Sequence, residues 1–248
     1  MVRKKGLTAI MISGLTLLSL NCAMLLGAKG VPLDIDGKLE VGDPEIQDDK
    51  FSDWYDISVD ENQKLAIWVN SGDFDTYLYV QPPFTAESSN DDTGQDNKNS
   101  SLVLTNRHAG IMRVGVTSYE DKETGSYDLH IRDISAAQVV FDQAGVLGPD
   151  GSDSKPDGEE GAKFEIPFEV DVQANQLVLV ELQSAEFDTF LIVEMPNGQR
   201  LENDDLNGSL DESMIFATTQ AAGKIKIIVT SYDVNETGNF TLKVSVVE

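Results

Sequence analysis

Cysteine, histidine and basic residues are scarce in this sequence of 248 residues. It contains one cysteine and two histidines, and it has 18 lysines and arginines against 43 aspartates and glutamates. The single cysteine, Cys22, cannot form an internal disulfide, so the chain must fold without one. The formal net charge of −25 argues against binding to nucleic acid or to an anionic membrane surface. Such acidity is typical either of a strongly solvated surface or of a protein that attracts cations.

The common signatures of catalytic sites are also missing. The sequence has no Gly-x-Ser-x-Gly nucleophile motif and no His-Glu-x-x-His zinc motif. Its histidines, His108 and His130, are replaced by Ala221 and Lys243 at the corresponding positions of the internal repeat described below. Carboxylates are abundant, but nothing in the composition singles out a pair for acid–base catalysis. We therefore predict that the protein is not an enzyme.

The N-terminal segment, residues 1–30, has the pattern of a secretory signal peptide. Three basic residues precede an uncharged, mostly apolar run from Leu7 to Leu26, and small residues follow it. We predict cleavage after Ala28 or Gly30 and export, with secretion or retention in the periplasm or cell envelope. A retained membrane anchor is the alternative, because the run approaches the length of a membrane-spanning helix. Removal of this segment, with its four basic and no acidic residues, changes the formal net charge from −25 to −29.

Cys22 lies within this segment and offers a further interpretation of it. In a lipoprotein, Cys22 would be acylated and would become the first mature residue. The preceding residues 18–21, Leu-Ser-Leu-Asn, match the usual leucine–small–small pattern poorly. An envelope-associated structural lipoprotein without a specific small ligand is therefore the alternative to a cleaved, exported protein, and a lipid anchor would be its only membrane contact.

The chain contains the same unit twice, at an offset of 113 positions. The stretch GDFDTYLYV at 72–80 corresponds to AEFDTFLIV at 185–193, and short motifs around it keep their order and spacing. These motifs are Asn62-Gln63 with Asn175-Gln176, Asn90-Asp91-Asp92 with Asn203-Asp204-Asp205, Thr117-Ser118-Tyr119 with Thr230-Ser231-Tyr232, and Glu123-Thr124-Gly125 with Glu236-Thr237-Gly238. A fixed period with matching order indicates duplication, and each copy is long enough to hold its own core.

Both copies have the pattern of short β-strands. From Phe74 to Val80 every second residue recurs unchanged in the second copy, and a period of two places these side chains on one face of a strand. No long amphipathic helical pattern occurs. We predict an all-β fold of two tandem antiparallel β-sandwiches, over residues 31–135 and 163–248. An acidic linker rich in Gly, Pro and Asp is predicted over 136–162, and the first strand of the second copy can lie before or after it.

Each copy resembles the bacterial pre-peptidase C-terminal domain. The shared pattern is Asp-x-x-Leu, an Asn-Asp-Asp-like turn, a glycine-led strand and a closing Gly-x-Tyr/Phe-x-Leu strand. It is found at residues 75–78, 90–92, 110–116 and 125–129, and again at residues 188–191, 203–205, 223–229 and 238–242. The resemblance covers most of residues 50–133 and 163–248, and it implies a jelly-roll-like β-sandwich of the kind attached to secreted proteases. Relatives of this domain family include the collagen-binding modules of bacterial collagenases, some of which hold calcium. No protease domain precedes the copies here, so we do not expect this chain to act as the appendage of a protease.

The acidic turns of the repeat are the candidate metal sites. The two equivalent sets are Asp75, Asn90, Asp91 and Asp92 in the first copy, and Asp188, Asn203, Asp204 and Asp205 in the second. Carboxylate and amide oxygens are the ligands that calcium prefers, and it takes six to eight of them. The alternative is structural, because Asp and Asn also stabilise turns by hydrogen-bonding to their own backbone. Calcium is the one cofactor that the sequence suggests.

Three aromatic residues, Trp54, Tyr55 and Trp68, are the candidate ligand contacts, because exposed aromatic rings form platforms for sugars or proteins. Trp68 is replaced by Glu181 in the second copy, which indicates either a solvent-facing position or a partly buried one at an interface between the copies. We predict an exported, non-catalytic binding or interaction module, similar to the accessory C-terminal domains of secreted bacterial proteases and stabilised by calcium if the acidic turns bind it. The expected partner is an extracellular or envelope protein or polysaccharide.

Overall fold

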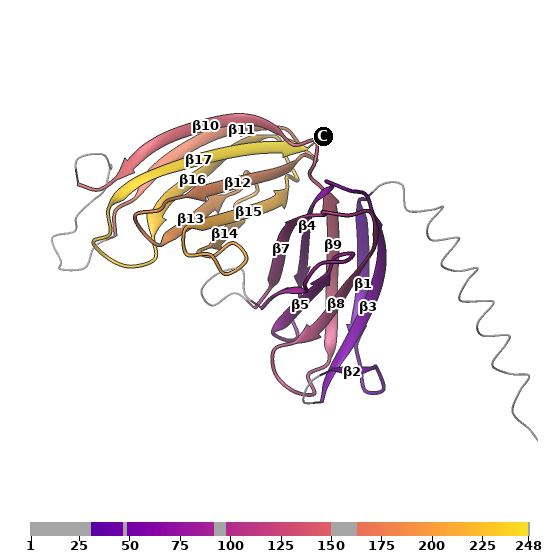
Figure 1. Ribbon diagram of the computed structural model, residues 1–248. Helices are drawn as coiled ribbons and strands as arrows, with labels where there is room; N and C mark the ends of the chain where they lie inside the picture. The colour runs from indigo at the N-terminus through magenta and orange to yellow at the C-terminus, as the bar shows by residue number, and fades with distance from the viewer. Residues whose placement is uncertain (1–30, 47–48, 92–97, 150–162, 248) are drawn as a thin grey trace, which may run out of the picture.

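The computed structural model describes residues 31–46, 49–91, 98–149 and 163–247. The predicted signal peptide, together with Cys22, lies outside the described residues. The described part of the chain consists of β-strands that pair in antiparallel sheets (Figure 1). In these residues no helix has the length and hydropathy needed to cross a membrane.

The first half of the chain forms a sandwich of two antiparallel sheets. One sheet has the order β1 (Leu33–Leu39), β9 (Gly125–Asp133), β4 (Lys64–Asn70) and β7 (Ser100–Thr105). The other has the order β2 (Glu45–Ile46), β3 (Lys50–Val59), β8 (Gly110–Ser118), β5 (Thr76–Gln81) and β6 (Ser88–Asn90). The chain passes repeatedly from one sheet to the other, which is the strand order of a jelly roll.

The second half repeats this order. One sheet contains β10 (Gln138–Leu147), β17 (Gly238–Val247), β12 (Leu177–Gln183) and β15 (Glu212–Thr218). The other contains β11 (Ile166–Val172), β16 (Gly223–Ser231), β13 (Thr189–Glu194) and β14 (Arg200–Asn203). Each strand of the first sandwich except the short β2 has a counterpart here. The predicted all-β fold of antiparallel β-sandwiches is therefore confirmed.

Alternate side chains of the central strands fill the space between the sheets. In β8 the side chains of Met112, Val114 and Val116 are fully buried, while Arg113 between them is exposed. The counterpart strand β16 has the same alternation, with buried aliphatic side chains at every second position. Burying one such side chain contributes about 1.5–3 kcal/mol. The buried residues form a separate hydrophobic cluster inside each sandwich.

Strand β10 corrects the predicted linker. The sequence predicts a linker over 136–162, but residues Gln138–Leu147 pair with β17, and Leu147 is buried in the core of the second sandwich. Of the predicted linker, only residues 150–162 lie outside the described residues. The first strand of the second sandwich therefore lies before the Gly/Pro/Asp-rich segment, which was one of the two possibilities that the sequence left open.

A shared packing device shows that β10 is the counterpart of β1. Gly37 in β1 leaves room for the ring of Tyr127, and a Cβ at this position would lie 2.1 Å from that ring. Gly145 in β10 does the same for Phe240, where the distance would be 2.4 Å. These glycines are 108 positions apart, whereas equivalent residues of the other strands are 113 positions apart. The similarity of β10 to β1 is therefore not visible when the two copies are aligned at an offset of 113.

The two sandwiches contact each other through equivalent faces. Ala66 and Val103 of the first sandwich belong to one hydrophobic cluster with Leu179 and Phe216, which occupy the same repeat positions in the second. Their sheets are the equivalent sheets of the two units. Equivalent positions of the two copies therefore contribute to one interface.

The side chain of Asn207 adds a polar contact between the sandwiches. Its Nδ2 donates to the carbonyl of Val103 at 2.9 Å, and its Oδ1 accepts from the amide of Val103 at 3.2 Å. Val103 belongs to β7, which is the last strand of its sheet. The amide of Asn207 thus pairs with the backbone of β7 on the side where no strand follows.

We expect a fragment of residues 136–248 to fold and a fragment of residues 163–248 to fail. The shorter fragment lacks β10, so β17 loses a paired neighbour and the core loses Leu147. Loss of one buried leucine side chain alone costs about 2–5 kcal/mol. Circular dichroism and urea unfolding of the two fragments measure the difference. Cooperative unfolding of both fragments at the same midpoint would contradict this role of β10.

Candidate functional site

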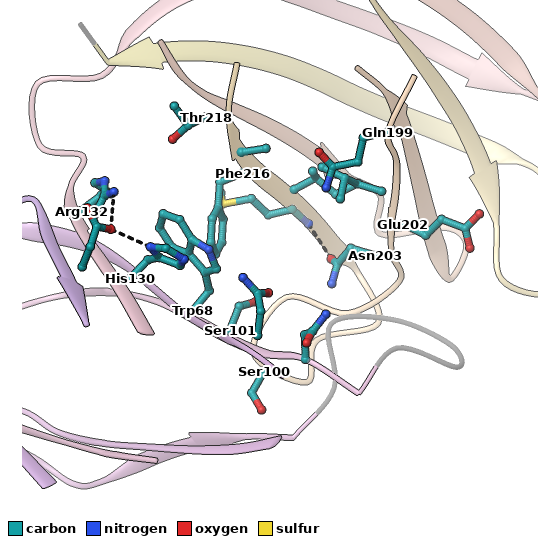
Figure 2. A pocket seen from close by; sticks show the side chains of 17 residues that line it. Trp68, Ser100, Ser101, His130, Arg132, Gln199, Glu202, Asn203, Phe216 and Thr218 are labelled. Carbon is teal, nitrogen blue, oxygen red and sulfur yellow. Dashed lines mark hydrogen bonds and ion pairs between the residues drawn. The ribbon is translucent and has the colours of Figure 1, made fainter. Parts of the chain in front are cut away.

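A cleft of about 460 Å³ lies between the two sandwiches, beside their hydrophobic contact (Figure 2). Trp68, His130 and Arg132 line it from the first sandwich, and Phe216 and Gln199 line it from the second. The wall therefore combines aromatic rings with charged and amide groups. Its size falls within the range of small-molecule sites, about 300–1,000 Å³.

Trp68 is at the centre of the aromatic wall of this cleft. Its ring stacks on His130, with centroids 4.9 Å apart, and meets the edge of Phe216 at 5.0 Å. The guanidinium of Arg132 lies over the same ring at 5.5 Å. Trp68 is thus partly buried at the interface between the copies and also lines the cleft, so both interpretations of this residue describe part of its environment.

Asp34 connects the two basic side chains of the cleft. Its Oδ1 lies 2.6 Å from Nδ1 of His130 and accepts a hydrogen bond of 2.6 Å from Arg132. Asp34 is placed opposite His130 by the pairing of β1 with β9. The hydrogen bond with His130, followed by that with Arg132, lowers the pKa of Asp34 against the opposing effect of burial, so this carboxylate stays ionised.

Sequence reasoning identified Trp68 as a ligand contact and Asn203 as part of an acidic turn, but it did not predict the remaining residues of the cleft as contacts. The roles of Asp34, Arg132 and Phe216 depend on strand register and on the contact between the copies. Neither can be read from one sequence. The only available signal was the alternation of β9, which places His130 and Arg132 on one face of the strand.

The acidic turn of the second sandwich gathers carboxylates around Asp188. Oδ1 of Asp188 and Oδ1 of Asp205 are buried and have no hydrogen-bond partner among the described residues. Burial and the neighbouring carboxylates, Asp205 and Glu236 first among them, raise the pKa of Asp188 to about 6. Burial also raises the pKa of Asp205. Buried carboxylate oxygens without donors are costly when ionised, and a bound cation would compensate them.

The equivalent turn of the first sandwich is less negative. Oδ1 of Asp75 and Oε2 of Glu123 are buried without a hydrogen-bond partner in the described chain. Burial raises the pKa of Asp75, but the positive charge of Lys98 opposes this shift. The position of Lys98 is occupied by Asp211 in the second copy. Asp92, a member of the predicted set, lies outside the described residues.

The two asparagines of the predicted sets hold strands in place. Oδ1 of Asn90 accepts a hydrogen bond from the amide of Ser101 at 3.0 Å. Oδ1 of Asn203 accepts one from the amide of Met214 at 2.7 Å, and its Nδ2 donates to the carbonyl of Asp205 at 3.2 Å. These contacts attach each turn to the next strand, β7 or β15. They agree with the structural interpretation of the asparagines.

The carboxylate oxygens that lack partners in the described chain are the atoms of the turns that a cation would contact. Among the described residues, no three side chains of His, Cys, Asp or Glu converge in a metal-binding arrangement. The buried oxygens without partners would still gain from calcium, which would supply the missing positive charge. Asp188, Asp205 and Glu236 are the carboxylates that a bound calcium ion would have to draw together in the second sandwich, and Asp75 and Glu123 are those in the first. The two glutamates are absent from the predicted sets, although the repeated Glu-Thr-Gly motif contains them. Calcium binding stays a prediction.

The structure separates the three candidate aromatic contacts. Successive residues of β3 point to opposite faces, so Trp54 lies on the outer face of its sheet while Tyr55 packs against the core. The hydroxyl of Tyr55 lies 2.5 Å from that of the buried Tyr127. Tyr55 is therefore partly buried against the core, and its role as a ligand contact stays a prediction. Trp54 and Trp68 belong to different sheets and to two separate surfaces.

No protein-family model and no curated protein matches the chain. Among solved structures, it is similar to the human CUB1-EGF-CUB2 domain of MASP-1/3, with 10% identity, 88% of this chain and 100% of that chain covered, and a TM-score of 0.26. The tandem CBM22-1–CBM22-2 domain of Paenibacillus barcinonensis Xyn10C matches at 10% identity, with coverages of 78% and 82% and a TM-score of 0.24. Tripeptidyl peptidase 2 matches at 11% identity, with 88% of this chain covered and a TM-score of 0.25, but the chain spans only 23% of its length. TM-scores this low carry no argument about function.

We expect calcium to raise the melting temperature of residues 31–248 by several degrees over the protein in EDTA. A ligand that binds only the folded state stabilises it by mass action, by about 2.7 kcal/mol at one hundred times its Kd. Differential scanning calorimetry in millimolar calcium, with sodium chloride at equal ionic strength as control, measures the shift. The change Asp188→Asn should remove more of it than Asp75→Asn. If sodium and calcium changed the melting temperature equally, the acidic residues would have only a structural role as caps of the turns.

In EDTA we expect Asp188→Asn to stabilise the protein at pH 8 and to leave its stability unchanged near pH 4. The pKa of about 6 in the folded state exceeds the value of about 3.9 for an unfolded Asp, so ionisation costs stability as pH rises between these values. The gain should be about 1 kcal/mol, because solvent screens a partly exposed carboxylate. Urea unfolding at both pH values tests this. The matched change Asp75→Asn should gain less, since Lys98 already compensates that site.

Proposed function

We propose that the chain is an exported, non-catalytic binding module that receives its ligand in the cleft between its two sandwiches. The observation that carries this proposal is the cleft of about 460 Å³ with an aromatic wall and a polar rim. Ligand sites in proteins combine a mostly apolar surface with a few placed polar groups that fix orientation. Here Trp68 and Phe216 supply the surface, and Arg132 and Gln199 supply polar groups on opposite sides.

The arrangement of the titratable groups in the cleft supports binding over catalysis. His130 is the residue there best suited to proton transfer, but its Nδ1 is engaged by Asp34 and its ring is stacked on Trp68. In the described part of the chain, no hydroxyl or thiol group is hydrogen-bonded to His130. A nucleophile activated by a base needs such a contact. The histidine therefore serves to position the aromatic ring and the carboxylate.

The partner that fits this module is an uncharged or weakly charged polymer outside the cytoplasm, such as a polysaccharide or a protein segment. The leader-like pattern of residues 1–30 supports export. The net charge of −25 disfavours anionic partners. The resemblance of both copies to the pre-peptidase C-terminal domain supports an accessory role beside other secreted proteins, to which calcium at the acidic turns would add stability.

The chain has two tryptophans, and only Trp68 lines the cleft. Removing the other one allows the fluorescence of the cleft to be measured by itself. In the variant Trp54→Phe, Trp68 becomes the only tryptophan and reports on the cleft. We expect at least one probe from a panel of neutral hexasaccharides and uncharged ten-residue peptides to change its emission saturably. Mass spectrometry should find that probe intact after prolonged incubation. Turnover of the probe would exclude a non-catalytic module.

A second substitution tests whether the ligand binds in the cleft. Gln199→Ala should weaken the response of Trp68 several-fold, because a typical hydrogen bond contributes about 0.5–1.5 kcal/mol. The control is Gln143→Ala, which removes an exposed glutamine of β10 that does not line the cleft. Equal effects of the two changes, or no response of Trp68 to any probe, would count against the cleft.

A further inference from the structure

The outer face of the β3–β8–β5 sheet carries a row of aromatic rings. Trp54 of β3 and Tyr79 of β5 lie on either side of Gly115, because both residues pair with this glycine of the central strand β8. Their ring centroids are 6.3 Å apart and their planes differ by 24°. Tyr77 continues the row, with its ring 4.7 Å from that of Tyr79. All three side chains are partly exposed, on strands that lie next to one another in the first sandwich (Figure 1). They form a continuous aromatic floor.

This aromatic floor, made of Trp54, Tyr77 and Tyr79, is held in place by its surroundings. A Cβ at Gly115 would lie 2.7 Å from the ring of Trp54, so the glycine is what lets the indole lie down on the sheet. The indole Nε1 donates to Oγ of Ser52 at 3.1 Å. The guanidinium of Arg113 packs against the same ring, 4.8 Å from its centroid. A ring fixed by three neighbours loses little conformational entropy when a ligand binds to it.

The second sandwich shows that the fold does not require this floor. Pro167, Ile228 and Ile192 occupy the positions of Trp54, Gly115 and Tyr79 there. The isoleucines are only 7% and 5% exposed, and Phe190, at the position of Tyr77, is 8% exposed, so the equivalent face is buried and keeps only one of the three rings. The first copy instead keeps large aromatic rings accessible to water, with a glycine beneath them. Exposed aromatic surface without a structural requirement indicates a binding surface.

Polar groups border the aromatic floor on both sides. The hydroxyl of Tyr77 donates to Ser89 at 3.1 Å, and Arg113 forms an ion pair of 3.5 Å with Asp56. The border thus contains hydroxyl groups and an ion pair. The charges of its carboxylate and guanidinium groups therefore already compensate each other. A ligand with a flat apolar face and hydroxyls at its edges suits this arrangement, because the rings contact the face and the border binds the hydroxyls. Pyranose rings have this chemistry.

We infer that the aromatic floor binds a neutral, extended β-linked polysaccharide, with successive sugar rings stacked on Trp54 and the two tyrosines. The acidity of the chain disfavours a polyanionic glycan. The three rings lie on one face of the same sheet, which favours a chain that extends along this face over a helical one. This inference builds on the proposed role as a binding module, but it uses a surface distinct from the cleft. The rings provide the affinity, and the polar border orients the chain.

The variant Trp68→Phe makes Trp54 the only tryptophan and tests the floor directly. Titration with cellohexaose, mannohexaose and chitohexaose should give a saturable change in its emission with at least one of them. Maltohexaose, which is helical, and an anionic oligogalacturonate should bind at least about tenfold more weakly. A tenfold change in affinity corresponds to 1.4 kcal/mol. No response to any of the three β-linked probes would overturn the inference.

Gly115→Ile is the decisive variant, because it gives the first sandwich the residue that the second already accommodates at this position. The new side chain should displace the indole and lower the affinity for the β-linked hexasaccharide at least about tenfold, while unfolding remains cooperative. Tyr79→Ala should have a similar effect. Phe84→Ala is the matched control, since it removes a ring that is 90% exposed in the same sandwich but lies outside the row. Unchanged affinity in Gly115→Ile and Tyr79→Ala would overturn the inference.

The two single-tryptophan proteins separate this inference from the proposed function. A response of Trp54 without one of Trp68 supports the aromatic floor and removes the cleft. A response of Trp68 alone, with Gln199→Ala sensitive and Gly115→Ile not, leaves the cleft as the binding site and overturns the floor. Calorimetry of the unmodified protein with the same hexasaccharide should give a stoichiometry of one if a single site binds, and Gly115→Ile should abolish this binding if that site is the floor.

Discussion

The register of strand β8 between β3 and β5 determines both the core and the surface of the first sandwich. With this register, Met112, Val114 and Val116 enter the core, and Arg113 and Gly115 face outward. A slip by one residue would exchange the two sets, because side chains alternate between the faces of a strand. The aliphatic residues therefore hold the outward residues in position. The stability of the core and the placement of Trp54 beside Tyr79 are consequences of the same pairing.

The duplication shows this constraint, because the two copies have the same pattern of buried residues but different residues on their outer faces. The buried positions of β8 and β16 are aliphatic in both copies, whereas the outward positions have diverged from Gly115 to Ile228. The acidic turns have diverged in the same way, with Lys98 in one copy and Asp211 in the other. Positions inside the sandwiches are restricted by packing, and positions outside have been free to acquire separate roles.

Much of the fold could be predicted from the sequence because period-two alternation and a constant offset are local signals. Strand β10 escaped because five additional residues change its offset from β1, and because it adjoins a segment with the composition of a linker. The pattern Asp-x-x-Gly-x-Leu, at 34–39 and again at 142–147, was the signal that could have identified it.

The candidate sites were less predictable. Strand register brings Trp54 to Gly115 and Asp34 to His130, and a single sequence contains no direct information about register. The asparagines of the turns could not be assigned either, since the same side chain can cap a strand or bind an ion.

The contact between Asn207 and Val103 has a consequence for the solubility of the chain. Strand β7 ends its sheet and presents unpaired backbone groups, which in an isolated sandwich would be open to pairing with a strand of another molecule. The amide of Asn207 occupies the backbone of Val103 as a neighbouring strand would, and the second sandwich covers the adjacent surface. The tandem arrangement thus shields an edge that a single copy would expose. Duplication in this protein thus provides a guard against association through the β7 edge of the first sandwich.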